Sequence, residues 1–328
     1  MVSTTNASLL SVQDLKTYFY TSYGVVKAVD GVSLEVNKGE VVGLVGESGS
    51  GKSITALSIM RLVPTPPGKI INGKVFYKGK DLLNLSEKEM ISIRGREISM
   101  VFQDPLTFLN PVLRIDDQIA EAVNIHQHKT KEEAKKEAVE ILKKVRISSP
   151  EQIAKSFPHQ LSGGMRQRVL IAMAVSCNPS IMIADEPTTA LDVTIQAQIL
   201  ELIKELRKEL DTSMILITHD LGIVAEVCDR VYVMYAGQVV EHADIFRIFE
   251  NPLHPYTSGL LKSALSIDQF SKELYTLEGS VPNLVNPPSG CVFHPRCPYA
   301  KDICNQKQPI LSKKEYGHTV ACWLYQEG

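Results

Sequence analysis

The sequence lacks any apolar run long enough to span a lipid bilayer. Its longest apolar runs, such as residues 181–184 and 214–217, are the size of a β-strand, whereas a spanning helix needs about 20 apolar residues. Residues 1–8 are polar and contain no basic segment followed by an apolar one, so we expect no secretory signal. These absences predict a cytoplasmic protein that reaches a membrane only through partner subunits.

An excess of charge of one sign, internal repeats and low-complexity tracts are also missing. The formal net charge of the 328 residues is −2, which provides no basic surface of the kind that binds nucleic acid. The hydrophobic share of 44% and the charged share of 22% are those of an ordinary globular protein. We therefore expect no nucleic-acid partner and one large or two unequal folded domains.

The first informative motif is a glycine-rich stretch at residues 46–53, Gly-Glu-Ser-Gly-Ser-Gly-Lys-Ser. It fits G-x-x-x-x-G-K-S/T, a pattern whose backbone N–H groups surround the phosphates of a nucleotide. An apolar strand precedes the motif and a helix follows it, as the pattern requires. We predict that Lys52 reaches the β- and γ-phosphates and that the Ser53 hydroxyl binds Mg²⁺. The other predicted nucleotide-binding residues here are Ser48, Gly49, Ser50, Gly51 and Ile54.

Polar residues follow three further apolar strands. Asp185 and Glu186 end a strand of four apolar residues, and the carboxyl ends of parallel strands face the ligand crevice of a sheet. We predict that Asp185 holds Mg²⁺ and that Glu186 deprotonates the attacking water. His219 is predicted to stabilise charge on the γ-phosphate, although a lone histidine is more often an ordinary loop residue. Gln103 is predicted to reach Mg²⁺ or the water through its amide.

A second glycine motif, Ser162-Gly163-Gly164, begins a helix and can bind an anion through a hydroxyl and backbone amides. It lies in a mainly helical segment at about residues 104–165, which we expect to be a subdomain inserted in an α/β core. Because this segment is separate from the strand ends, we predict that the motif contacts a nucleotide bound to another subunit. Standing alone, it would be an ordinary glycine-containing helix start.

The pattern of elements predicts the fold class. Antiparallel strands are expected at residues 9–20, 25–29 and 32–36, and Asn72-Gly73 indicates a hairpin turn. Strands and helices alternate between residues 181 and 235, which indicates a parallel sheet covered by helices. Beyond residue 251, frequent prolines are expected to interrupt any long element.

Four cysteines crowd the last part of the chain: Cys291, Cys297, Cys304 and Cys322. In a chain without an export signal, such a cluster indicates metal ligation more than disulfides. Four thiolates can hold a Zn²⁺ ion or a 4Fe–4S cluster, and the remaining alternative is four unligated thiols. Because little apolar periodicity remains in this region, a metal would stabilise it.

The motifs together resemble the ATPase subunit of an ABC transporter, over about residues 8–250. The resemblance implies an ABC-type P-loop ATPase core at residues 1–250 that hydrolyses ATP with Mg²⁺. It also implies that an aromatic residue among Tyr18, Phe19 and Tyr20 stacks on adenine, with Phe19 favoured by the alignment. The matching motifs are Walker A at residues 46–53, Walker B at 181–185, the catalytic glutamate at Glu186, the Q-loop at Gln103, the signature at 161–167, the D-loop at 189–192 and the switch histidine at His219.

A narrower resemblance rests on residues 102–105, 109–111 and 251–257, the last reading Asn-Pro-Leu-His-Pro-Tyr-Thr. These segments are similar to the di- and oligopeptide importer branch, which includes nickel importers. The resemblance implies an ATPase dimer at the cytoplasmic face of the cell membrane, bound to two permeases that an extracellular peptide-binding protein supplies. Import of nickel chelates or another solute, or a non-transport role, are the alternatives. The chain has neither the long coiled coil of DNA-maintenance relatives nor the two cassettes of translation-associated ones.

The same resemblance favours a 4Fe–4S cluster over zinc at the four cysteines, because some members of this branch bind such a cluster there. Residues 251–328 are then expected to form a small C-terminal extension that carries the cysteine cluster.

Overall fold

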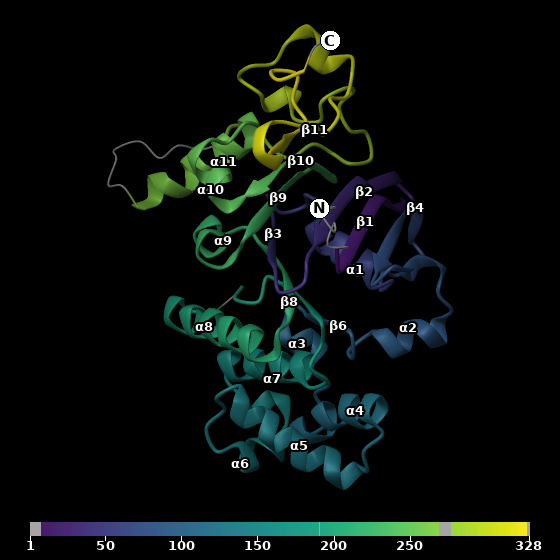
Figure 1. The fold of residues 1–328 in the computed structure, drawn as a ribbon, viewed down its shortest axis with the longest axis vertical. Coiled ribbons are helices and arrows are strands. Elements are labelled where there is room, and N and C mark those ends of the chain that lie inside the picture. Colours follow the sequence, from purple (N-terminus) through teal and green to yellow (C-terminus); the bar gives the residue numbers. More distant parts are fainter. Residues whose placement is uncertain (1–7, 190, 269–276, 327–328) are drawn as a thin grey trace, which may run out of the picture. The chain divides into compact units, whose positions relative to one another are not determined.

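The computed structural model describes residues 8–189, 191–268 and 277–326. Residues 1–7 of the polar start and Ala190 of the expected D-loop lie outside the described residues. The chain divides into two compact units (Figure 1), Met1–Asn84 with Leu216–Gly328, and Leu85–Ile215. None of the helices in the described ranges combines the length and the apolar character that crossing a membrane requires.

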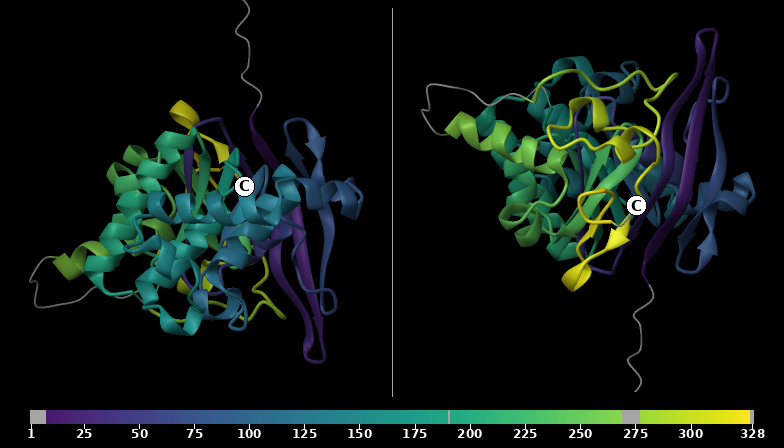
Figure 2. Two further views of the ribbon diagram at one scale, coloured as in Figure 1. Left: turned by 90° about the horizontal axis from the view of Figure 1, so that it is seen from below. Right: turned by 90° about the horizontal axis from the view of Figure 1, so that it is seen from above.

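The first unit contains a four-stranded antiparallel sheet with the order β2-β1-β4-β5. Strand β1 (Leu10–Thr21) pairs with β2 (Gly24–Val36) and with β4 (Gly68–Tyr77), and the short β5 (Lys80–Asp81) pairs with β4. In both views of Figure 2 the long strands β1 and β2 run side by side. The antiparallel strands expected near the N-terminus are confirmed, except that residues 25–29 and 32–36 form one continuous strand.

The expected hairpin at Asn72-Gly73 is wrong, because both residues lie inside β4. The pairing of β4 with β1 shifts register between Gln13 and Lys16, and Gly73 adopts a φ of 110° opposite this bulge. A Cβ atom at Gly73 would lie 2.6 Å from Leu15 Cα. The glycine therefore permits close backbone approach at a bulge rather than a turn.

A second sheet in the same unit carries the phosphate-loop motif. Strand β9 (Arg230–Tyr235) pairs in parallel with β3 (Val41–Val45) and antiparallel with β10 (Gln238–Asp244). Every residue of β3 is buried, as its continuous apolar sequence predicts. The helices of this unit are α1 (Lys52–Ile59), α9 (Leu221–Val227), α10 (Ile245–Glu250) and α11 (Pro255–Asp268), with the 3-10 turn η1 (Leu82–Asn84).

The second unit contains β6 (Ile98–Val101) and β7 (Ile181–Asp185), which pair in parallel. Its helix α5 (Lys131–Lys144) is amphipathic, with Ala134, Ala138 and Leu142 among its buried residues. A capping box at Thr130 starts this helix. The other elements are α2 (Glu87–Ile93), α3 (Pro105–Phe108), α4 (Ile115–Gln127), α6 (Pro150–Ala154), η2 (Pro158–Gln160), α7 (Gly163–Val175) and α8 (Val193–Leu210). Strand β8 (Ser213–Thr218) runs from this unit into the first.

The prolines beyond residue 251 do not prevent a long element, since α11 has 14 residues. Pro255 is the first residue of this helix, where a missing N–H costs no hydrogen bond. Within the described residues 277–326 the chain forms only short elements, η3 (His294–Arg296), η4 (Asp302–Asn305), β11 (Ser312–Lys313), η5 (Glu315–Gly317) and β12 (Thr319–Val320). Strand β12 pairs with β10, so the C-terminal segment extends the sheet of the first unit.

Candidate functional site

The loop at residues 46–53 connects β3 to α1, as the motif predicts. Gly46 and Gly51 have φ angles of 152° and 100°, which residues with side chains rarely adopt. A Cβ atom would lie 2.2 Å from Met234 O at Gly46, and 2.3 Å from Ala28 O at Gly51. Both positions therefore require glycine, and the loop lies tightly against the neighbouring backbone.

Lys52 is buried, and its side chain points back into the loop. Its Nζ donates to Gly46 O at 2.8 Å and to Glu47 O at 3.0 Å. Helix α1 begins without a capping side chain, and a Cβ atom at Gly49 would meet nothing within 4 Å. An ammonium group, an open helix N-terminus and free space at a glycine suit an anionic phosphate. Ser50 is fully buried here, Ser53 and Ile54 are partly buried, and Ser48 is exposed.

The three candidate aromatic residues for adenine lie along β1 with different surroundings. The Tyr18 hydroxyl donates to Asp30 Oδ1 at 2.7 Å, and burial together with Asp30 raises the pKa of Tyr18. Tyr20 is 52% exposed, and Phe19 is partly buried. Only Tyr18 of the three is thus tied to a neighbouring carboxylate.

The acidic pair in the second unit lies at the end of β7. Asp185 is its last residue and is 5% exposed. Glu186 has a φ of 45°. This left-handed backbone conformation is unfavourable for residues other than glycine, and such strained residues cluster at functional sites. Its Oε2 accepts from Gln103 Nε2 at 2.9 Å and from Thr189 Oγ1 at 2.8 Å. Since β6 and β7 are parallel neighbours, their carboxyl ends bring Gln103 and Glu186 together.

Ser162 forms the N-cap of α7, where its Oγ accepts from Met165 N at 3.4 Å. A Cβ atom at Gly164 would lie 2.8 Å from Ile195 Cγ2, so glycine is needed where α7 packs against α8. At Gly163 the nearest atom would be Leu191 Cδ2 at 3.6 Å, an ordinary contact. Steric need therefore explains Gly164 but not Gly163.

His219 follows β8 directly and is exposed, in the first unit. The next residue, Asp220, caps helix α9 by accepting from Gly222 N at 2.8 Å. This cap fixes the backbone next to His219 and so the position of the His219 Cα atom.

Comparison with known proteins identifies the family. The ABC transporter family matches residues 29–189, and the family described as the oligopeptide/dipeptide transporter C-terminal region matches residues 240–304. The chain belongs to the ATP-binding proteins of ABC transporters. It is 56% identical to the oligopeptide transport ATP-binding protein AppD of Bacillus subtilis, over 98% of each chain. It is 52% identical to the dipeptide transport ATP-binding protein DppD of the same organism, over 97% of this chain and 95% of that one.

The fold is that of an ABC ATPase. A solved dimeric ATP-binding cassette in a post-hydrolysis state, bound to ADP and Pi, superimposes with a TM-score of 0.65 at 29% identity, and covers 72% of this chain and 98% of its own. The chain is therefore an ABC-type ATPase, as its sequence motifs predict. ATP and Mg²⁺ are the substrate and metal ion that this family uses.

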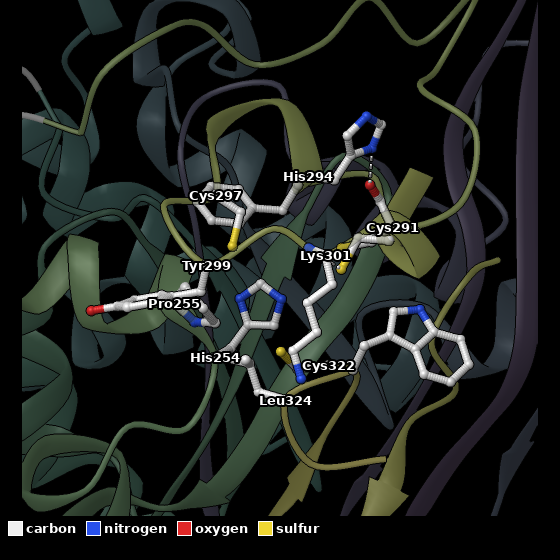
Figure 3. Close-up of a pocket in the computed structure, with 12 residues that line it drawn as sticks. His254, Pro255, Cys291, His294, Cys297, Tyr299, Lys301, Cys322 and Leu324 are labelled. Carbon is white, nitrogen blue, oxygen red and sulfur yellow. Dashed lines mark hydrogen bonds between the residues drawn. The ribbon is translucent and has the colours of Figure 1, made fainter. Parts of the chain in front are cut away.

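The predicted metal cluster at the C-terminal cysteines is wrong. Cys291, Cys297, Cys304 and Cys322 do line one cavity together with His254 (Figure 3). However, within the described ranges no group of three or more His, Cys, Asp or Glu side chains is placed to hold a metal ion. All six cysteines lie in these ranges and none forms a disulfide.

The cavity that the four cysteines line is small. It encloses about 10 Å³, room for about one water molecule. Burial raises the pKa of Cys291 to about 11 and raises those of Cys297 and Cys322, which favours the protonated thiols in this arrangement. A cavity of this size does not hold an iron–sulfur cluster, and Cys291, Cys304 and Cys322 pack as small buried side chains.

Sequence reasoning missed several residues that hold the first unit together. Glu241 is fully buried in β10 and accepts hydrogen bonds from Leu253 N, His254 N and His318 Nε2. Arg296 pairs with Glu47 of the phosphate loop. Glu241 stands in the sequence Gln-Val-Val-Glu-His-Ala-Asp, among other polar residues, so the sequence gives no signal that it is buried. Arg296 lies among prolines and cysteines without periodicity and offers no signal either.

Proposed function

We propose that this ATPase powers the import of dipeptides or oligopeptides through a membrane ABC transporter. The observation that carries the proposal is the match of residues 240–304 to the oligopeptide/dipeptide transporter C-terminal region. Relatives at about half identity over nearly the full length support it, since they are named as peptide transport proteins. Residues 1–250 would form the ATPase domain, with the helical subdomain at about 104–165, and residues 251–328 the extension.

In this proposal the phosphate loop and Phe19 hold ATP. The loop residues that bind it are Ser48, Gly49, Ser50, Gly51, Lys52, Ser53 and Ile54. The oxygen atoms of Ser53, Gln103 and Asp185 would hold Mg²⁺, which prefers hydroxyl, amide and carboxylate oxygen ligands. When bound, Mg²⁺ neutralises charge on the β- and γ-phosphates.

The proposed chemistry is attack of water on the γ-phosphate, which breaks the bond between the γ-phosphorus and the bridging oxygen and releases ADP and inorganic phosphate. Glu186 accepts the proton of that water, and the hydrogen bonds from Gln103 and Thr189 orient its carboxylate. Lys52 and His219 donate to the γ-phosphate oxygens, where negative charge develops. Lys52 must first release Gly46 O and Glu47 O to do so.

A second ATPase subunit, identical or homologous, would complete the site with its Ser162, Gly163 and Gly164. The dimeric state of the solved cassette that this chain resembles supports the arrangement. Two transmembrane permeases would hold the dimer at the cytoplasmic face of the cell membrane, and an extracellular peptide-binding protein would deliver the cargo. Closure on ATP and reopening after hydrolysis would drive the permeases.

Reconstitution tests this function. The chain is assembled in proteoliposomes with two permease subunits and a peptide-binding protein from the same organism, and uptake of a radiolabelled tripeptide is measured with and without ATP on the side of the ATPase. ATP-dependent peptide uptake is the expected result. ATP hydrolysis with uptake of a nickel chelate but no peptide would contradict peptide import.

A Glu186→Gln variant separates binding from chemistry in the same assay. It should bind Mg-ATP as the wild type does and lose at least about 100-fold in turnover, because it keeps the shape of the residue but not its basicity. Unchanged turnover would refute the role of Glu186.

A further inference from the structure

Glu47 is the point at which the C-terminal part of the chain holds the phosphate loop. Its carboxylate accepts from both terminal nitrogens of Arg296, with Nη1–Oε2 at 2.7 Å and Nη2–Oε1 at 3.1 Å. Its backbone N–H donates to the Tyr256 hydroxyl at 2.8 Å. Its carbonyl oxygen accepts from Lys52 Nζ at 3.0 Å. The ion pair thus joins Glu47 of the phosphate loop to Arg296, which lies 249 positions further along the chain.

The Arg296 side chain is buried and makes further contacts besides its ion pair with Glu47. It is only 5% exposed, and it also donates to Glu278 O at 2.9 Å and Leu277 O at 3.2 Å. Its guanidinium lies 5.7 Å from the centre of the Tyr235 ring. A bidentate arginine–carboxylate pair whose guanidinium also donates to two backbone carbonyls has a fixed geometry, whereas the side chains of an exposed ion pair move freely.

Tyr256 is fixed in the same way. It is fully buried, and its ring packs against Tyr235 and Phe293 at centroid distances of 4.7 and 5.5 Å. Burial raises the pKa of Tyr256, so its hydroxyl stays neutral and accepts from the Glu47 N–H. Neither contact to the loop can therefore shift without moving a packed core.

We propose that Arg296 and Tyr256 are positioning residues of the phosphate loop, through which the C-terminal extension sets the affinity of the ATPase for ATP. This inference rests on the proposed function, since it takes residues 46–53 as the ATP-binding loop. Two physical effects carry it. The contacts fix the backbone at Glu47, beside the carbonyl that Lys52 must leave when phosphate binds. The guanidinium also neutralises a carboxylate within the loop that receives an anion.

The electrostatic effect predicts a specific pattern of variants. Arg296→Ala leaves the Glu47 carboxylate uncompensated in the phosphate loop, where it repels the triphosphate. Arg296→Ala with Glu47→Gln removes both charges, so affinity should recover even though the ion pair is still absent. Arg296→Lys keeps the charge but loses the two-pronged geometry, so its affinity should lie between those of the wild type and Arg296→Ala.

The experiment measures binding of Mg-MANT-ATP to the full-length chain by fluorescence, and the KM and kcat of ATP hydrolysis in the assembled transporter. Arg296→Ala should raise Kd and KM about tenfold, a usual size for coupling between sites, and change kcat less than about twofold. The double variant should regain most of this loss. Arg247→Ala, which breaks the ion pair with Asp244 on α10 in the same unit, is the matched control and should bind as the wild type does.

Thermal unfolding of every variant shows whether folding is intact. If Arg296→Ala does not fold, Arg296→Lys and the double variant still test the charge effect. Unchanged KM in Arg296→Ala would overturn the inference. A folded double variant as weak as Arg296→Ala would overturn the electrostatic effect and support the fixing of the loop backbone as the cause. A wild-type chain that binds no Mg-MANT-ATP would overturn the proposed function, whereas a wild-type chain that binds it and an Arg296→Ala variant with the same affinity and KM would overturn only this inference.

Discussion

Glu241 offers the sharpest test of how the C-terminal segments are attached to the sheet. It lies in β10 with no exposed surface and accepts three hydrogen bonds. The donors are Leu253 N at 2.6 Å, His254 N at 2.9 Å and His318 Nε2 at 2.7 Å. One carboxylate therefore joins the segment leading into α11 and the segment near the C-terminus to the same strand.

The stability lost when Glu241 is replaced can be worked out from the number of N–H donors that lose their acceptor. Glu241→Ala leaves three buried N–H groups without a partner, and each such group costs about 1–3 kcal/mol. Some regain a water molecule in the space left by the side chain, so we expect a loss of about 3–5 kcal/mol in the free energy of unfolding. Glu241→Gln keeps one acceptor oxygen and should lose about 1–3 kcal/mol.

Urea unfolding followed by tryptophan fluorescence suits this measurement. The single tryptophan, Trp323, lies in the C-terminal segment and donates to Lys307 O at 2.8 Å, so its emission reports on the segments that Glu241 holds. Glu250→Ala, an exposed carboxylate on α10, is the control and should change the midpoint little. A loss below about 1 kcal/mol in Glu241→Ala would refute the reasoning.

Three further predictions concern pH, the water-activating carboxylate and the phosphate loop. Burial lowers the pKa of His254 from 6.5 to about 4. As pH falls, the unfolded chain therefore binds the proton before the folded chain does, so the burial of neutral His254 costs no stability above pH 6.5 and lowers the free energy of unfolding between pH 6.5 and 4. The urea midpoint should drop over that interval. Thr189→Val removes a hydrogen bond to Glu186 and should lower kcat about tenfold with KM for ATP unchanged, while Thr189→Ser should keep the wild-type rate; an unaltered kcat in Thr189→Val would contradict the orienting role. Gly46→Ala places a Cβ atom 2.2 Å from Met234 O, so the loop must shift and the Kd for Mg-ATP should rise about 100-fold; a fully folded variant, checked by circular dichroism, that binds normally would exclude this account.

The sequence could predict what depends on local pattern and on parallel-strand geometry. The all-apolar runs at β3 and β7 define buried strands, and each ends at a polar motif. Because parallel strands present their carboxyl ends at one edge, Gln103 and Glu186, which follow two such strands, could be expected at that edge, although the sequence does not predict the hydrogen bond between them. Placement at an edge needs only the right order of elements.

The sequence could not predict contacts that depend on irregular backbone. Asn72-Gly73 has the composition of a turn, but the bulge opposite it in β1 makes the glycine a site of close approach. The pair of Glu47 with Arg296 joins a loop to a short 3-10 turn far along the chain. No periodicity relates such positions, so only the folded backbone brings them together.

The mistaken metal cluster has the same origin. Few apolar residues recur at regular spacing beyond residue 251, a pattern that predicts a segment without a core of its own. The segment instead shares a core with the sheet. Phe293 packs edge-on against Tyr235 of β9, with 5.2 Å between ring centres, and both are buried. Apolar burial of this kind, together with the acceptor at Glu241, stabilises the extension. Because that shared core also holds Tyr256 and Arg296, the attachment of the extension and the position of the phosphate loop depend on the same packing, and a change that loosens one should weaken the other.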